Sequence, residues 1–489
     1  MNFSDLDTYI NRAVQPVTDW LSGIVFFKIP FPGAEIPFVV LWLVAGGVVF
    51  TFYFRFVNLR LFVHALRLVR GDFSKASPNA KAGSSRTEDA GEVSHFQALA
   101  TALSGTVGIG NIGGVAVAIS AGGPGATFWM VLAGFLGMST KFVECTLGVK
   151  YRREHSDGTV SGGPMFYLER GLAELGLPRL GRMIGVFYAL GLCIGCLGIG
   201  NMFQSNQAYA QFLNVTGAAA SPFVGLGWLF GLLLAACVGL VIIGGLSTIV
   251  RVTEKVVPLM ALLYMGMALV VIGMNYEALP FAVAQIFGEA FTVRGAAGGA
   301  LGAMVIGFQR AVFSNEAGIG SASIAHSAVR TKEPVTEGIV SLLEPFIDTV
   351  VICTTTALVI VTTLYFDSNF TAGPGGVEMT SRAFERNLSW SPVPLAFAAL
   401  LFAFSTMVAW AYYGLKGWTY LIGRSAGAEL AFKIIFCVFI VIGSAIQLDA
   451  VLGFSDALVF VICVPNILGL YLLAPQVKRE LNAYLKSES

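Results

Sequence analysis

Three glycines near residue 110 have the spacing of a site that binds a dinucleotide. The stretch Ser104–Gly114, SGTVGIGNIGG, contains Gly108, Gly110 and Gly113 in a G-x-G-x-x-G pattern. This pattern holds a pyrophosphate only when it follows a β-strand, opens a helix and precedes an acidic residue by about 20 positions. Here the preceding residues, HFQALATALSG, are typical of a helix, and the next acidic residue is Glu144. The context argues against a dinucleotide, so the bare backbone must serve another purpose.

The other chemistry-bearing residue types form no catalytic or metal-binding pattern. The seven cysteines lie in apolar runs, and the pair Cys193 and Cys196 has no βαβ pattern around it, so we expect neither a redox motif nor a disulfide framework. The four histidines lack metal-ligand spacing, and the sequence contains no G-x-S-x-G motif. We therefore expect a protein that is not an enzyme.

Composition places the chain in the membrane. Of 489 residues, 56% are hydrophobic and only 12% are charged, against about 25% charged residues in soluble domains. The mean hydropathy is +0.75. The net charge of +1 does not indicate a protein that binds nucleic acid. The fold class indicated is an all-α polytopic membrane protein whose partner is the lipid bilayer.

Eleven segments reach the roughly 20 apolar residues that a helix needs to cross a bilayer. They are 36–57, 97–121, 124–149, 182–212, 222–245, 254–275, 296–326, 337–365, 392–422, 430–448 and 450–474. Lysine and arginine crowd every second loop, most of all after the first and third segments, whereas the intervening loops are nearly bare. Because basic loops remain in the cytoplasm, we expect a plasma-membrane protein with its N-terminus outside and its C-terminus inside. Residues 3–22 have a helical pattern and are expected to lie on the outer surface.

Two of these spans are predicted to be broken. Five glycines in 105–114 would weaken a helix. A second span, Gly299–Ser321, carries Gly302, Gly307, Gly318 and Gly320 beside Arg310 and Glu316. Glycines alone would equally suit a small-residue contact between helices. However, each broken span opens one of two sets of five helices, and the two enter the membrane from opposite sides. This pairing is typical of a transporter with an inverted repeat and a binding site at the membrane midplane.

The repeat sets the domain boundaries. Residues 1–95 hold the surface segment, the extra span and a cytoplasmic linker, residues 96–276 and 277–475 are the two five-helix repeats, and residues 476–489 form a cytoplasmic tail. The first and sixth core helices are the discontinuous ones.

A helix break supplies groups for both ends of a zwitterion. A half-helix that starts near Ile109–Asn111 presents free N–H groups and a positive dipole end to a carboxylate. A half-helix that ends near Ser104–Val107 leaves carbonyl oxygens for Na⁺ or an ammonium group. Ser405 and Thr406, deep in an apolar span, either bond their own helix carbonyls or act as neutral oxygen ligands for a cation. Among the charged residues, Lys141 and Glu144 are spaced for a local ion pair.

Several strings resemble the alanine or glycine:cation symporter (sodium:alanine symporter) family, which has the fold of the bacterial leucine transporter. They are GTVGIGNIGGVAVAI, GGPGATFWM, SGGPMFYLERGL and, most specifically, RAVFSNEAGIGSASIAHS. The resemblance covers nearly the whole chain. It implies sodium-coupled import of a small neutral amino acid, alanine or glycine, by alternating access. The alternatives left open are coupling to protons, with Lys255 supplying a titrating charge, and a larger neutral substrate such as glutamine. The oligomeric state stays open.

The resemblance also implies the residues of the site. The substrate would contact Ile109, Gly110, Asn111, Phe203, Gln204, Asn206, Gly307, Phe308, Gln309, Thr406 and Trp410. The co-transported sodium ion would be bound by Ser104, Val107, Phe402, Ser405 and Thr406. Trp410 would bound the volume of the pocket.

Overall fold

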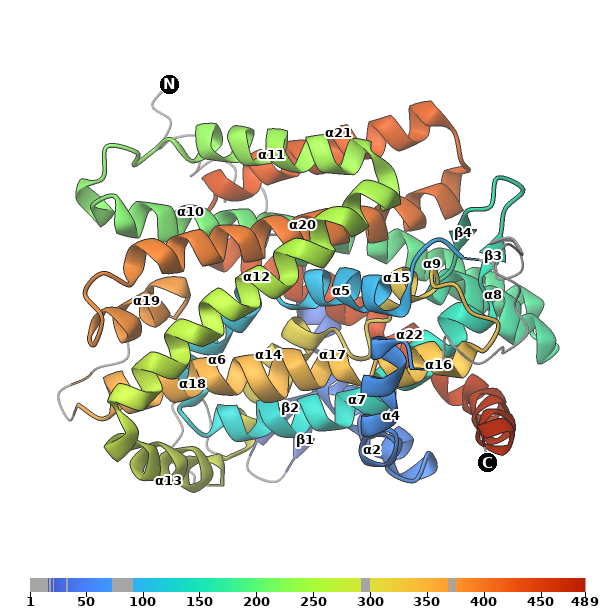
Figure 1. The fold of residues 1–489 in the computed structure, drawn as a ribbon, viewed down its shortest axis with the longest axis horizontal. Helices are drawn as coiled ribbons and strands as arrows, with labels where there is room; N and C mark the ends of the chain where they lie inside the picture. The colour runs from blue at the N-terminus through green and yellow to red at the C-terminus, as the bar shows by residue number, and fades with distance from the viewer. Residues whose placement is uncertain are drawn as a thin grey trace.

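Long apolar helices run alongside one another through most of the molecule (Figure 1). The structure is a computed structural model that describes residues 16, 19–20, 22–31, 34–72, 91–291, 300–367, 370 and 375–488. Within these residues, seven helical segments are long and apolar enough to cross a membrane. They are α7 (Ala126–Lys150), α9 to α10 (Pro178–Val215), α12 (Gly245–Met274), α16 to η6 (Pro334–Tyr365), α20 (Pro392–Ile422), α21 (Ala426–Ala445) and most of α22 (Leu448–Glu488). The bent pair of α5 (His95–Thr106) and α6 (Gly113–Gly122) makes an eighth, and α2 (Phe38–Tyr53) and α11 (Gly227–Ile243) are shorter apolar helices.

The predicted segments lie at the positions of these helices in the sequence, but several observed helices differ from them in length. Each of the eleven contains helix, but by length and composition the described residues provide at most eight spans. The predicted surface helix at 3–22 and the linker at 71–94 lie mostly outside the described residues.

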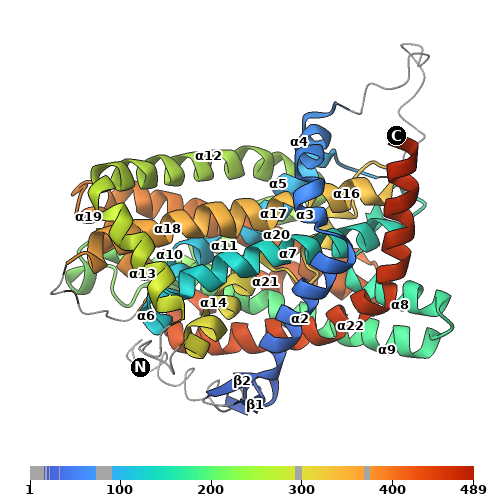
Figure 2. The ribbon, with the colours of Figure 1, turned by 90° about the horizontal axis from the view of Figure 1, so that it is seen from below.

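Short elements gather at the two ends of the helical bundle. At one end lie strands β3 (Arg153–Glu154) and β4 (Val160–Ser161), helix α8 (Pro164–Glu174), α16 (Pro334–Val340) and the C-terminus (Figure 1). At the other end lie α13 (Leu279–Ala290) and α19 (Val377–Glu385). The hairpin of β1 (Lys28–Phe31) and β2 (Ala34–Pro37) precedes α2, and α12 lies along the face opposite this hairpin (Figure 2).

The first predicted helix break is confirmed. Helix α5 begins with a capping box, in which Ser94 and Gln97 bond each other's backbone amides. It ends at Thr106, the backbone is extended at Gly108, and a single 3₁₀ turn, η1 (Ile109–Asn111), leads into α6. The two half-helices meet at 59°. Every residue from Ala98 to Ala116 is buried, so the broken segment lies in the interior of the bundle.

The second break is also present, towards the end of the predicted span. Helix α14 (Ala300–Asn315) is continuous, and α15 (Ala322–His326) begins after a six-residue loop. Glu316, Gly318 and Gly320 have φ values of 59°, 93° and 87°, in the left-handed region that ends a helix. Both breaks therefore lie where glycines are clustered in the sequence.

The outer helices expose apolar side chains, as lipid-facing helices do. Leu240 on α11 and Leu262 on α12 are 76% and 74% exposed. Apolar surface of this extent on a helical bundle marks contact with a membrane. The centrally placed α7, by contrast, is buried on most sides and carries the fully buried Lys141 and Glu144.

Candidate substrate and ion site

At the first break, two backbone amides bond side chains in place of helix carbonyls. The amide of Gly108 donates to Oδ1 of Asn111 at 2.9 Å, and the amide of Ile109 donates to Oε1 of Gln204 at 3.1 Å. In a continuous helix these amides would bond the carbonyls of Ser104 and Gly105. Those two oxygens therefore lose their usual helix partners at the position where the sequence predicts a cation site.

A bare backbone position faces two polar side chains across this break. A Cβ atom added to Gly108 would lie 2.6 Å from Oγ1 of Thr406 and 3.1 Å from Oε1 of Gln204. Thr406 is 1% exposed, and its hydroxyl has no hydrogen-bond partner within the described part of the chain. A buried hydroxyl without a partner costs about 1–3 kcal/mol. A polar group or ion that enters the break would supply the missing partner.

Three of the predicted sodium ligands are joined directly. The hydroxyl of Ser104 on α5 donates to the carbonyl of Ser405 on α20 at 2.7 Å. The hydroxyl of Ser405 donates to the carbonyl of Phe402 at 3.1 Å and lies 3.3 Å from the sulfur of Met260. The bond of Ser405 to its own helix is one of the two uses that the sequence left open. Val107, the fifth predicted ligand, caps the end of α5. All these groups offer oxygen atoms, the ligand type that a hard cation prefers.

Trp410 connects the predicted pocket wall to the second break. Its indole Nε1 donates to Oε1 of Glu316 at 2.9 Å, and the other carboxylate oxygen of Glu316 accepts a hydrogen bond from Ser321. A Cβ atom on Gly200 would lie 2.0 Å from the Trp410 side chain, so only glycine allows the helix carrying it to approach this closely. Trp410 follows Thr406 by one helical turn on α20. These two hydrogen bonds fix the carboxylate of Glu316, the first residue of the second break.

The α14 residues beside the first break differ from those predicted. Gly110 lies closest to Phe313 and Ser314, at 3.7 and 3.9 Å from a built Cβ atom. Phe313 also meets the ring of Phe203, with centroids 5.0 Å apart. By contrast, Gly307 contacts the α7 backbone, and the Phe308 ring lies near Trp129, also on α7. The predicted set Gly307, Phe308 and Gln309 lies in the continuous part of α14, before the residues that meet Gly110.

Two other predicted residues face away from the first break. The side-chain amide of Asn206 donates to the carbonyls of Gly443 and Ile446, at the end of α21. Lys255 is exposed on α12, so it does not supply a charge to this site. The neighbouring Thr253 points inward instead and meets Thr101 on α5 at 3.2 Å.

The carboxylate of Asp348, to which the sequence analysis gives no role, holds the first break through Asn111. The side-chain amide of Asn111 donates to Oδ1 of Asp348 at 2.6 Å, while Ser314 and Thr349 donate to Oδ2 at 2.9 and 2.7 Å. Asp348 is fully buried in the π-helical segment η5 (Phe346–Cys353). The bulge that turns it towards Asn111 has no clear signal in the sequence beyond the nearby Pro345.

The predicted ion pair between Lys141 and Glu144 is wrong. The Lys141 ammonium lies 3.2 Å from Glu344, which comes from a distant part of the chain. Glu144 instead accepts bonds from the Gly318 amide at 3.0 Å and from Asn466 at 2.9 Å, and so holds the second break.

Further buried charges continue from this pair towards the end that carries β3 and β4. Glu344 also bonds His326, and Glu337 bonds both His326 and His95. Cys145, His326 and Glu344 bring three potential metal-ligand atoms within 4.8 Å of one another. However, Glu344 already pairs with Lys141 there. Arg310 pairs with Asp456 on α22 and so joins α14 to the last helix.

Comparison with known proteins decides the class. A model of the sodium:alanine symporter family matches residues 31–489. The chain belongs to this family. This membership confirms the resemblance seen in the motifs. The protein is a multi-pass membrane transporter of amino acids and not an enzyme.

Two relatives of known name and one solved structure are similar to the chain. The chain is 36% identical to the sodium/alanine symporter AgcS of Methanococcus maripaludis, over 92% of this chain and 94% of that protein. It is 32% identical to the probable sodium/glutamine symporter GlnT of Bacillus subtilis, over 92% and 88%. The crystal structure of MhsT in complex with L-phenylalanine matches with a TM-score of 0.57 and 16% identity, over 81% of this chain and 99% of that one. The last likeness shows a leucine-transporter-like fold.

Proposed function

We propose that this symporter imports alanine or glycine together with Na⁺ by alternating access. One observation carries the proposal: at the first helix break, the bare Gly108 faces the unpartnered hydroxyl of Thr406 and the amide oxygen of Gln204. A small polar molecule fits such a place, because it meets backbone and neutral oxygens without an intervening Cβ atom. The sodium/alanine symporter among the relatives supports the same substrate and ion.

The carboxylate and the ammonium group of an amino acid would bind on opposite sides of the first break. The N–H groups of Ile109 and Gly110, with Asn111 beside them, would receive the carboxylate at the start of the second half-helix. Gln204, Phe203 and the α14 residues beside Gly110 would line the pocket, and Trp410 would limit its size. The sodium ion would be bound by neutral oxygens of Ser104, Val107, Phe402, Ser405 and Thr406. No residue in this set carries a charge, so the ion would be held weakly and released readily.

The proposal includes an orientation and a repeat. Residues 96–276 and 277–475 would form the two inverted five-helix repeats, each opened by one of the broken helices. The loop at 150–181, the loop at 327–336 and the C-terminus would face the cytoplasm of a bacterial or archaeal cell. Their common location at one end of the bundle supports this orientation, as does their excess of lysine and arginine (Figure 1).

Uptake into proteoliposomes tests the function directly. Purified protein is reconstituted, and uptake of each of the twenty amino acids is measured with and without a Na⁺ gradient at constant pH. We expect Na⁺-dependent uptake of alanine or glycine, with little uptake of glutamine or larger residues. Uptake that follows a pH gradient without Na⁺ would favour proton coupling. A preference for glutamine, the substrate named for one relative, would overturn the assignment of a small pocket.

A further inference from the structure

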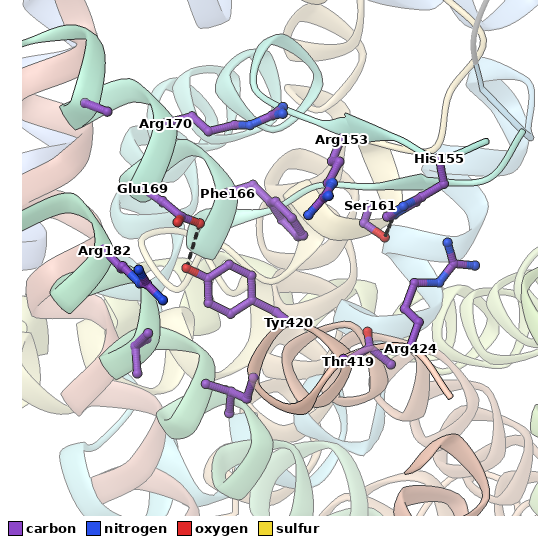
Figure 3. A pocket seen from close by; sticks show the side chains of 14 residues that line it. Arg153, His155, Ser161, Phe166, Glu169, Arg170, Arg182, Thr419, Tyr420 and Arg424 are labelled. Atoms are coloured by element: carbon purple, nitrogen blue, oxygen red, sulfur yellow. Dashed lines mark hydrogen bonds between the residues drawn. The ribbon is translucent and has the colours of Figure 1, made fainter. Parts of the chain in front are cut away.

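A large cleft opens at the end of the molecule that carries β3, β4 and α8. Its volume is about 820 Å³, and its walls come from β3, α8, the first turns of α9 (Pro178–Leu197) and the end of α20 (Figure 3). This cleft is separate from the helix breaks. Its polar lining includes Arg153, Arg170, Arg182, Arg424, His155 and Glu169.

The cleft is strongly positive. Four arginines and one glutamate line it, a net charge of +3 with His155 neutral, or +2 when the Asp157 that pairs with Arg424 is included. The single carboxylate, Glu169, already accepts a hydrogen bond from Tyr420 at 2.9 Å. The lowered pKa of His155 is consistent with this field, since burial disfavours its charged form and the nearby Arg424 and Lys416 repel a further positive charge. An anion of matching size would relieve this repulsion.

The four arginines differ in what holds them. Arg170 donates to the backbone carbonyls of Tyr151 and Arg152 at 3.2 and 2.8 Å, which fixes its guanidinium. Arg424 pairs with Asp157 at 2.9 Å. Across the described residues, Arg153 and Arg182 have neither a hydrogen-bond acceptor nor an ion-pair partner, and they reach the cleft from different elements (Figure 3). Two guanidinium groups are thus available to an anion such as phosphate, which arginine binds in a bidentate manner as it does carboxylate.

An apolar helix face continues from the cleft along the outside of the bundle. Arg182 and Val186 line the cleft from α9. On the same helix, Phe187, Leu190 and Ile194 are 48%, 49% and 46% exposed and follow at helical spacing. A soluble phosphate would use only the polar part. A phospholipid would place its headgroup among the arginines and its acyl chain along α9.

We propose that this cleft binds the phosphate headgroup of an anionic phospholipid from the cytoplasmic leaflet. The proposal goes beyond amino-acid transport, and it takes from the proposed function only the orientation in the membrane. Basic pockets at the cytoplasmic ends of membrane helices suit such headgroups, because the field of several arginines adds to specific phosphate contacts. The cleft's position beside α8 and α20 would let a bound lipid stabilise the end of the pocket-lining helix.

Thermal stability of the purified full chain in a neutral detergent gives the test. Short-chain phosphatidylglycerol is titrated against short-chain phosphatidylcholine, and glycerol 3-phosphate is titrated separately. We expect only phosphatidylglycerol to raise the melting temperature in a saturable manner. An equal response to phosphatidylcholine would overturn the proposal, and an equal response to glycerol 3-phosphate would assign the cleft to soluble phosphates instead. This comparison uses the wild-type protein alone.

Paired variants locate the site. Arg153→Gln with Arg182→Gln should raise the half-saturating phosphatidylglycerol concentration about twenty-fivefold, from about fivefold for each lost arginine near a lipid phosphate. The matched control, Arg60→Gln with Arg67→Gln, removes two exposed arginines that do not line the cleft and should change this concentration less than twofold. If both pairs weaken binding equally, the attraction is a general surface charge effect and the proposed site is wrong. Arg153→Lys with Arg182→Lys keeps the charge but loses the planar guanidinium groups, so its binding should be weaker than wild type and stronger than that of the glutamine pair.

Discussion

At Gly108 the proposed site leaves no room for a single added methyl group. A Cβ atom there would meet Thr406 Oγ1 at 2.6 Å, whereas at Gly110 the closest atom would be a Phe313 ring carbon at 3.7 Å, an ordinary contact. Neither glycine has a positive φ, so backbone strain is not involved. We expect Gly108→Ala to reduce alanine uptake at least fivefold, from an overpacking cost of about 1–3 kcal/mol. Gly114→Ala on α6, where a built Cβ atom would meet no other atom within 4 Å, is the matched control and should stay within about threefold. Similar uptake by the two folded variants would contradict the placement of the site.

Trp410 gives a second test at the residue scale, directed at selectivity. Trp410→Ala enlarges the proposed pocket and should admit larger neutral amino acids while weakening alanine. Trp418→Ala on the same helix removes an indole that bonds the Ala428 carbonyl instead, so its substrate profile should match wild type. The measurement is competition of unlabelled amino acids against labelled alanine. An unchanged profile for Trp410→Ala would mean that another residue limits the pocket.

At the scale of elements, the contact between α5 and α20 should control the response to sodium. Ser104 joins the two helices through the Ser405 carbonyl, and Thr406 faces Gly108. We expect Ser405→Ala to raise the Na⁺ concentration for half-maximal alanine binding, with little change in alanine affinity at saturating Na⁺. Thr406→Ala should change both, because its hydroxyl lies at the substrate side. Binding of alanine to the purified single variants, titrated with Na⁺, measures this. An unchanged response in both variants would place the cation outside this contact.

The sequence predicts elements better than contacts between them. Glycine clusters identify both breaks, because the cost of glycine in a helix is a local property. The register of α14 at the site was not predictable, since it depends on where left-handed residues from Glu316 onward end the helix. The partner of Lys141 was also missed. Spacing along one helix suggested Glu144, but Glu344 reaches it only after the chain returns through several further helices.

At the scale of the whole molecule, transport should respond to membrane voltage. A zwitterion carries no net charge, and the proposed ion ligands are neutral, so each cycle would move the charge of the sodium ion. A single charge corresponds to about 2.3 kcal/mol per 100 mV, or roughly fiftyfold accumulation of substrate. We expect an interior-negative potential, set with a potassium gradient and valinomycin, to accelerate alanine uptake into proteoliposomes. Uptake that does not change with voltage would contradict coupling to Na⁺ alone.

Composition and short motifs predict the class of the whole molecule, but not how many of its helices cross the membrane completely. The family and the membrane class follow from motifs and hydropathy, which do not depend on tertiary contacts. The number of complete crossings does depend on them, because α2 and α11 are short and α14 is separated from α15 by the loop at 316–321. Which helices cross fully is a property of the assembled bundle.

The hydrogen bond between Trp410 and Glu316 joins two parts that a transporter would otherwise adjust separately. In the proposed function, Trp410 limits which side chains are accepted, and the second break would rearrange when the site changes the side to which it opens. The bond would then link selectivity to the rate of transport. Variants selected to transport a wider range of amino acids should therefore have lower transport rates. Second mutations that restore the rate are expected around Glu316 and Ser321 rather than in the pocket.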